Sequence, residues 1–319
     1  MLKKYSIYII ISLIIIMIIW IIKLNTKNSI TKDHQFEIND ISLINKVFLA
    51  DRSGNTITLT KEKNNTSWLV NDKFIVRKDA ITTILSTANE IRIKRPASKT
   101  AFENVVKSIA TTGVYVEFFE NEKIVKSYWI GSNTSDHLGT YMLLKNSEQP
   151  FVIHIPSFNG FLSPRYGIQG NTLDILNWRS NIVFNKSFDS IDHIKYTDFL
   201  NPDKSYFFIK NPMELINSKN KSVPFNYDKV LTLLNSFENL NCETFKKNKL
   251  NIKSATQIEE LIVNCDTLRT YKISDLETIK KKENFTVKRK YATLNNGEVM
   301  LIQDYVFNKV LININEITD

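Results

Sequence analysis

Residues 41–51, with the sequence ISLINKVFLAD, have a counterpart in residues 188–198, with the sequence FDSIDHIKYTD. The two stretches are 147 residues apart, carry apolar residues at the same positions and both end in an aspartate, Asp51 or Asp198. Val47 and Leu49 are two residues apart, which is the spacing of residues on one face of a β-strand. The recurrence predicts one structural unit that occurs twice in the chain.

An amphipathic helix is expected in each copy, over residues 79–92 and 228–241. Apolar residues recur at helical spacing in both, at an offset of 149 residues. Any two amphipathic helices resemble each other, so this match alone is weak evidence. It supports a repeat because its offset of 149 is close to the offset of 147 between the strand segments. We expect the apolar faces to cover a sheet, through Ile81, Ile84, Leu85 and Ala88 in the first copy and Val230, Leu233, Leu234 and Phe237 in the second.

Strand candidates surround both helices and extend the correspondence. Tyr128 matches Tyr271 at an offset of 143, and Tyr141 matches Tyr291 at an offset of 150. Short strand segments joined by tight turns are typical of antiparallel sheets. The expected fold class is α+β, with an N-terminal single transmembrane helix followed by two similar strand–helix–strand units with largely antiparallel sheets. A single α+β domain with coincidental periodicity is the alternative.

The expected domain organisation has five parts. An anchor covers residues 1–24, a linker 25–35, the first unit 36–155, a connector 156–183 and the second unit 184–319. The connector contains three of the eight glycines of the chain, which indicates an irregular segment. Within it, Trp178 and Arg179 are candidates for a junction between the units. The alternative is that Trp178 fills the core of the second unit and that Arg179 is a solvated cation.

The stretch from Tyr5 to Ile22 is uncharged over eighteen residues, eleven of them isoleucine. A helix of this length spans about 27 Å, close to the hydrocarbon core of a bilayer. A cleaved signal peptide is the alternative, but the apolar run is long for one and no Ala-x-Ala-like site follows. We therefore expect residues 5–22 to contact the lipid bilayer, in a single-pass protein of the inner membrane whose soluble region faces the periplasm.

The remainder of the chain is moderately basic. It has 42 lysine and arginine residues against 33 acids, and three of the lysines precede residue 25, so the rest carries a net charge of +6. One interpretation is an anionic-partner patch; the other is a solvated surface in a lysine-rich chain. Nucleic acid is not an expected partner, because no basic stretch is interleaved with aromatic residues. The candidate patch comprises Lys280, Lys281, Lys282, Lys288, Arg289 and Lys290.

The sequence contains no recognisable catalytic, cofactor-binding or metal-binding motif. The four histidines occur in no metal-ligand spacing, and no nucleophile elbow, phosphate-binding loop or dinucleotide fingerprint is present. No catalytic residue, cofactor or metal is therefore expected, although a carboxylate pair without a local signature would leave an enzyme possible. The two cysteines, Cys242 and Cys265, either form a disulfide or serve as small hydrophobic residues.

Several loose motifs resemble an uncharacterised bacterial membrane-anchored envelope family, known only as a domain of unknown function. These motifs are Ile44-x-x-Val47-x-Leu49-x-Asp51, residues 67–71 (SWLVN), residues 94–98 (KRPAS) and residues 177–184 (NWRSNIVF). Members resemble companions of gliding-type ABC transporter auxiliary subunits. The resemblance covers most of residues 36–250, fades toward the C-terminus and supplies no catalytic residue.

The expected function is that of a non-enzymatic, membrane-anchored, extracytoplasmic accessory protein that binds an envelope protein partner. The resemblance implies an ABC transporter auxiliary subunit as that partner. The alternative function is a binding module for anionic lipid or glycan in the cell envelope, which depends on the basic patch.

Overall fold

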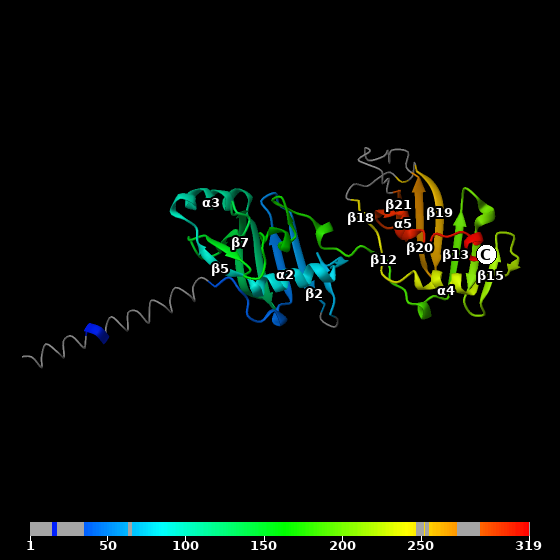
Figure 1. Ribbon diagram of the computed structural model, residues 1–319, viewed down its shortest axis with the longest axis horizontal. Coiled ribbons are helices and arrows are strands. Elements are labelled where there is room, and N and C mark those ends of the chain that lie inside the picture. Colours follow the sequence, from blue (N-terminus) through cyan, green and yellow to red (C-terminus); the bar gives the residue numbers. More distant parts are fainter. Residues whose placement is uncertain are drawn as a thin grey trace, which may run out of the picture. The chain divides into compact units, whose positions relative to one another are not determined.

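The computed structural model describes residues 15–17, 35–62, 66–246, 252, 255–272 and 288–318 (Figure 1). The chain divides into two compact units, Met1–Ser180 and Asn181–Asp319. The division falls inside the range 156–183, where a connector was expected. Each unit is built around one large antiparallel sheet.

The first unit contains a nine-stranded sheet in the order β4-β3-β2-β1-β6-β7-β8-β9-β5 among the described residues. Neighbouring strands pair antiparallel throughout. A small separate hairpin, β10 (Ile168–Gln169) and β11 (Thr172–Leu173), follows. The nine strands are β1 (Lys46–Ala50), β2 (Thr56–Lys61), β3 (Trp68–Val70), β4 (Phe74–Ile75), β5 (Arg92–Pro96), β6 (Val114–Glu120), β7 (Lys123–Asn133), β8 (Thr140–Leu144) and β9 (Phe151–His154).

Two helices accompany this sheet. Helix α2 (Lys78–Glu90) buries its predicted apolar face against the sheet, with Ile84 and Ala88 fully buried and Leu85 partly buried. Helix α3 (Lys99–Thr112) is capped by Ser98, whose side chain accepts a hydrogen bond from the amide of Ala101. Buried residues of α3 lie outside the core cluster that includes α2, and Ile109 contacts β7 at Gly131.

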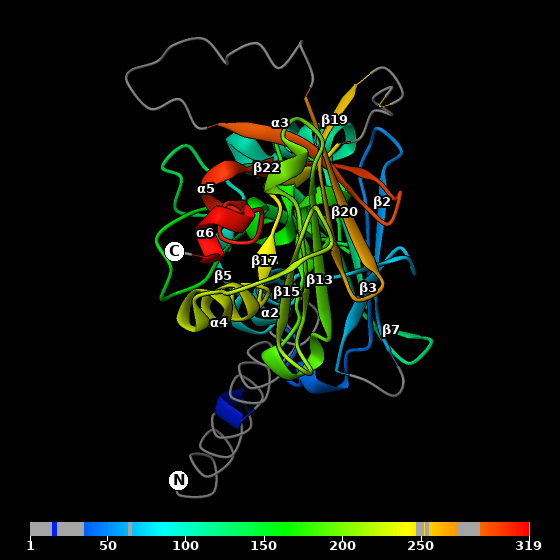
Figure 2. The ribbon, with the colours of Figure 1, turned by 90° about the vertical axis from the view of Figure 1, so that its right-hand side faces the viewer.

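The second unit repeats this strand order, β16-β15-β14-β13-β19-β20-β21-β22-β18. Helix α4 (Tyr227–Asn235) follows strands β13–β16 in the chain as α2 follows β1–β4. Helices α5 (Asp304–Phe307) and α6 (Ile314–Thr318) contribute buried residues to the same core as α4, and all three helices are labelled in Figure 2. A short pair, β12 (Ile182–Phe184) with β17 (Leu240–Asn241), stands apart. The nine strands are β13 (His193–Asp198), β14 (Tyr206–Ile209), β15 (Glu214–Asn217), β16 (Ser222–Val223), β18 (Thr244–Phe245), β19 (Thr256–Val263), β20 (Asp266–Lys272), β21 (Arg289–Leu294) and β22 (Val299–Gln303).

The strand register matches residues between the two sheets. Leu49 pairs with Val116, as Tyr196 pairs with Leu261. Val116 in turn pairs with Tyr128, whereas Leu261 pairs with Leu268. The residue that corresponds to Tyr128 is therefore Leu268. The match of Tyr128 with Tyr271 suggested by the sequence is wrong by three residues.

The start of each sheet is also alike in detail. A short 3-10 helix precedes the first strand in both units, η1 (Ile41–Leu43) and η4 (Phe188–Ser190). Asp51 and Asp198 are both buried at the end of that strand and accept hydrogen bonds from backbone amides of the loop that follows. The recurrent aspartate thus fixes the same strand-to-loop transition twice.

The predicted fold class is wrong. The described chain is mostly antiparallel sheet with few helices, arranged in two large sheets, rather than an α+β protein with a transmembrane helix. Several strands are only two to five residues long, such as β4, β5 and β18, and too short for a periodic pattern to reveal. Residues 5–22 lie outside the described part except for Ile15–Met17. The single-pass, signal-anchor prediction has no support in the structure, because no helix within the described residues is long and apolar enough to cross a membrane.

Candidate functional site

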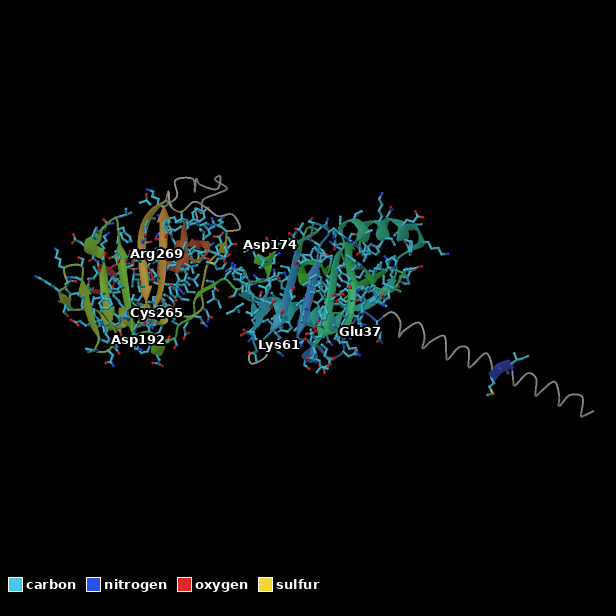
Figure 3. The ribbon with its side chains drawn as sticks, turned by 180° about the vertical axis from the view of Figure 1, so that it is seen from behind. Glu37, Lys61, Asp174, Asp192, Cys265 and Arg269 are labelled. Atoms are coloured by element: carbon cyan, nitrogen blue, oxygen red, sulfur yellow. The ribbon has the colours of Figure 1, made fainter. Side chains whose placement is uncertain are left out.

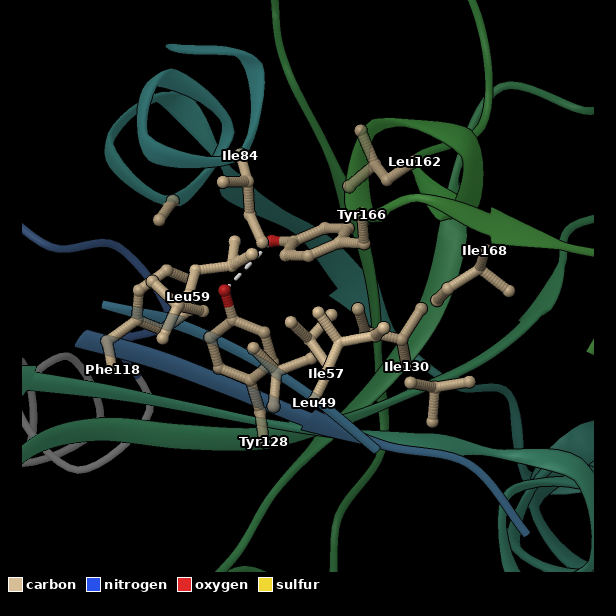
Figure 4. Packing of buried hydrophobic residues seen from close by; sticks show 14 of the residues in the cluster. Leu49, Ile57, Leu59, Ile84, Phe118, Tyr128, Ile130, Leu162, Tyr166 and Ile168 are labelled. Carbon is tan, nitrogen blue, oxygen red and sulfur yellow. Dashed lines mark hydrogen bonds between the residues drawn. The ribbon is translucent and has the colours of Figure 1, made fainter. Parts of the chain in front are cut away.

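A pocket with a volume of about 500 Å³ lies at one end of the first sheet. Its floor is the cross-strand pair Val114 and Ile130, from β6 and β7, together with Ile168 from β10. Figure 4 shows Ile130 and Ile168 among the packed core residues of this unit. All three floor residues are buried. The full lining consists of Thr112, Val114, Ile130, Gly131, Ser132, Asn133, Phe161, Ser163, Pro164, Ile168, Gln169, Gly170 and Asn171.

One wall forms where β7 departs from the ladder that it makes with β8. Their register runs from Ile130–Met142 to Asn133–Thr140, and it shifts across Gly131 and Ser132. Such irregularities commonly redirect side chains beside binding sites. A Cβ atom on Gly131 would lie 2.6 Å from the Ile109 side chain, so only glycine permits this close approach of α3 to β7.

The opposite wall is the segment from Phe161 to Asn171, which the sequence placed in a connector. It belongs to the first unit, because Leu162, Tyr166, Ile168 and Leu173 are part of the first core. Its hairpin turns at Gly170, which has a φ of +63°. The segment expected to join the units is therefore a wall of the pocket.

Buried hydrogen bonds hold this segment against the sheet. The Tyr128 and Tyr166 hydroxyls lie 2.8 Å apart in the core (Figure 4), and the amide of Leu162 donates to Thr140 Oγ1 at 2.8 Å. Asp51 Oδ2 accepts a hydrogen bond of 2.9 Å from the amide of Leu173. These bonds tie the segment to the sheet at three points, so contacts within the chain fix this wall of the pocket.

Asp51 is the charged anchor of that arrangement. Burial opposes its ionisation, but hydrogen bonds from Asn55, Leu173 and Ser53 outweigh burial and lower the pKa of its carboxyl below the ordinary value. The carboxylate is therefore the stable form at neutral pH, and it holds the loop and the pocket wall together.

The pocket itself is uncharged. Its thirteen lining residues, all within the described chain, include no aspartate, glutamate, histidine, cysteine, lysine or arginine. Their polar groups are hydroxyls, side-chain amides and backbone groups. Such groups orient a neutral ligand by hydrogen bonding, whereas acid–base or nucleophilic catalysis needs a titratable or activated side chain.

The corresponding position in the second unit carries charge instead. Glu259 and Thr270 replace the floor pair Val114 and Ile130, and Thr270 Oγ1 donates to Glu259 at 2.7 Å. Lys290, which corresponds to Thr140, contacts the same carboxylate at 3.0 Å. Glu259 and Thr270 are both buried, so this ion pair fills the place where the first unit has an apolar floor.

Two tyrosines extend this polar cluster. Tyr196 donates to Glu259 at 3.3 Å and stacks on Tyr206, with ring centroids 5.7 Å apart. Burial raises the pKa of both hydroxyls, and the nearby Glu259 carboxylate raises that of Tyr196 further. Both tyrosines therefore remain neutral. Tyr196 supports the internal ion pair through its hydrogen bond to Glu259, and Tyr206 contributes by ring stacking on Tyr196.

Trp178 and Arg179 lie in the first unit. Trp178 is 1% exposed and belongs to the first core, so the expectation that it fills the second core is wrong. Its backbone carbonyl accepts from the amide of Arg77. Arg179 is also buried, and its guanidinium lies 3.9 Å from the centroid of the Phe74 ring, so it is not a solvated cation. Their expected role as a junction stays a prediction.

The predicted basic patch lies partly outside the described residues, which exclude Lys280, Lys281 and Lys282. Lys288 is exposed. Arg289 pairs with Glu243 at 2.5 Å, and Lys290 pairs with Glu259. The charges of Arg289 and Lys290 are thus neutralised within the protein and do not form an open cationic surface with Lys288.

No disulfide joins Cys242 and Cys265. Cys242 is buried, whereas Cys265 is exposed in the turn between β19 and β20 (Figure 3). Of the two alternatives left open by the sequence, the disulfide is excluded in this structure. The described residues also contain no cluster of three or more histidine, cysteine, aspartate or glutamate side chains that could hold a metal ion.

Sequence reasoning missed the pocket, because its lining comes from α3, β7 and a segment interpreted as a connector. The glycines at 131 and 170 were the available signals. Comparison of the chain with protein-family models, with curated proteins and with solved structures found no match. The site must therefore be interpreted from its own geometry.

Proposed function

We propose that the chain is a non-enzymatic accessory protein that binds an envelope protein partner. The observation that carries this proposal is the preformed pocket of the first unit, which has an apolar floor, neutral polar walls and no titratable lining residue among the described residues. A site of this chemistry binds a neutral group without transforming it. The envelope location stays a prediction from the sequence, and an ABC transporter auxiliary subunit as partner rests on the sequence resemblance alone.

The charged groups of the second unit support the same proposal. Lys290 pairs with Glu259 and Arg289 pairs with Glu243, so these charges are engaged within the unit and are not presented to a charged ligand. The alternative of an anionic lipid or glycan ligand gains no support from these residues, because two members of the basic patch are already paired with acids.

Affinity capture of the tagged full chain from detergent-solubilised membranes tests the proposal. We expect one protein partner in stoichiometric amount, retained when the salt concentration is raised to about 0.5 M, because screening weakens exposed charge contacts much more than apolar ones. A capture without any stoichiometric protein contradicts the proposal. Release of all bound material by salt favours the anionic-ligand alternative.

A further inference from the structure

The pocket of the first unit separates apolar from polar contacts by depth. Val114, Ile130 and Ile168 form a buried floor, whereas Ser132, Gln169 and Asn171 are exposed at the mouth. Such a site fits an occupant with an apolar end and a neutral, hydrogen-bonding part behind it.

We propose that this pocket receives an uncharged aromatic or branched aliphatic side chain, carried on an extended peptide segment of the partner protein. This inference rests on the proposed function, because it names the part of the partner that the first unit recognises. The volume of about 500 Å³ is within the range of small-ligand pockets, roughly 300–1,000 Å³, and holds one large side chain with adjoining backbone.

The mouth favours a peptide over a simple hydrocarbon. The side chains of Gln169 and Asn171 each carry an amide donor and an amide acceptor, the same pair of groups that a peptide unit presents. The backbone of Gly131 and Ser132, where the register with β8 shifts, lies beside them. A hydrocarbon would cover these groups without satisfying them, which costs free energy.

The floor excludes a charged side chain. A carboxylate or ammonium group placed against Val114 and Ile130 would lose its hydration and meet no opposite charge among the lining residues of the described chain. The second unit supplies the contrast, because Glu259 there needs three donors, Tyr196, Thr270 and Lys290, to be accommodated at the equivalent place. The apolar site is therefore a property of the first unit.

Methyl-labelled full-length protein provides the direct test. The methyl signals of Val114, Ile130 and Ile168 are followed by NMR during titration with the blocked tripeptide Ac-Ala-Phe-Ala-NH2, with its analogues that carry Glu or Lys at the centre, and with toluene. We expect saturable shifts of these three residues with the phenylalanine peptide, and binding at least about tenfold weaker with either charged analogue. Equal binding of toluene and peptide identifies a small-molecule pocket and overturns the peptide assignment; an absence of shifts with the phenylalanine peptide overturns it as well.

A pair of variants connects the pocket to the partner. Ser132→Trp fills the mouth, and Val125→Trp adds an indole at an exposed position near the other end of the same strand. We expect the first variant to lose the captured partner and the phenylalanine peptide, and the second to keep both. Capture of the partner by both variants leaves the proposed function intact and contradicts the pocket as its site, whereas failure of the wild-type chain to capture any protein contradicts the proposed function itself.

Discussion

Removing the Glu259 carboxylate is expected to destabilise the second unit selectively. Glu259→Ala deprives Thr270, which is fully buried, and Lys290, whose side chain is 22% exposed, of their common acceptor. An unsatisfied buried polar group costs about 1–3 kcal/mol, and a broken buried ion pair about 3–5 kcal/mol. Because Lys290 regains some hydration, we expect a loss of about 2–4 kcal/mol in the free energy of unfolding.

A grafted variant makes this reasoning sharper. Replacing Glu259 by Val, Thr270 by Ile and Lys290 by Thr installs the residues that the first unit carries at the corresponding positions. A well-packed apolar group in place of a buried ion pair is often neutral or stabilising. The Tyr196 hydroxyl still loses its acceptor Glu259, so we expect the triple variant to regain most of the lost stability and to lie about 1 kcal/mol below the wild type.

Urea denaturation and hydrogen-exchange mass spectrometry measure both variants. With a urea slope of about 2 kcal/mol/M, the single variant shifts the midpoint of the second unit by about 1–2 M. Exchange localises the effect, since peptides that cover β19–β21 should lose protection while those that cover β6–β8 keep it. A single variant within about 0.5 kcal/mol of the wild type, or a triple variant as unstable as the single one, would refute the reasoning.

Three further predictions address the first unit and the thiols. The folded protein lowers the pKa of Asp51, so the stability that its carboxylate contributes is present above the unfolded pKa of about 3.9 and is lost as the pH falls through the folded value. Urea midpoints measured against pH should therefore decrease in acid, and Asp51→Asn should weaken this dependence. Trp178→Ala should cost about 3–5 kcal/mol by opening a cavity in the first core, seen as an earlier loss of exchange protection in β1–β9, and a loss below about 1 kcal/mol would contradict this placement. Cys265 should react with a thiol reagent in the native protein, and Cys242 only in denaturant; equal native rates would contradict their different burial.

Sequence periodicity located the longer elements. The predicted helices over 79–92 and 228–241 correspond to α2 and α4, and their apolar faces are buried. Helix α4 nevertheless ends at Asn235, and Phe237 is buried from the turn that follows. The apolar pattern predicts which side chains are buried. It does not distinguish a buried residue inside a helix from one in the turn that follows, so the end of α4 was predicted too late.

The sequence predicted where strands occur better than it predicted which residues of neighbouring strands pair. The two-residue turns at Asn121 and Asn264 align at an offset of 143, and this offset matched Tyr128 with Tyr271. In the sheets, however, the equivalent residues Val47 and Ile194 pair at different distances from these turns. Val47 pairs with Phe118, three residues before Asn121, whereas Ile194 pairs with Val263, one residue before Asn264. A hairpin of different length therefore displaces the match, and only the hydrogen-bonded register reveals it.

The pocket could not be predicted from the sequence either, because it also depends on contacts between distant parts of the chain. Ile130 and Ile168 are 38 residues apart and meet only because the Tyr128–Tyr166 and Asp51–Leu173 hydrogen bonds fold the glycine-containing segment onto the sheet. A cluster of glycine and proline indicates irregular backbone, but it does not distinguish a free linker from a packed wall.

Site-specific photo-crosslinking tests most directly whether the first unit binds a partner through this pocket. Benzoylphenylalanine is placed at the exposed pocket residue Asn171 and, as a control, at the exposed Asn308 of the second unit in the full chain. After irradiation of the cells that produce the protein, mass spectrometry of the adducts should identify one uncharged, apolar-centred partner segment at position 171 and none at position 308. The same adducts at both positions, or adducts at position 308 alone, would contradict the account.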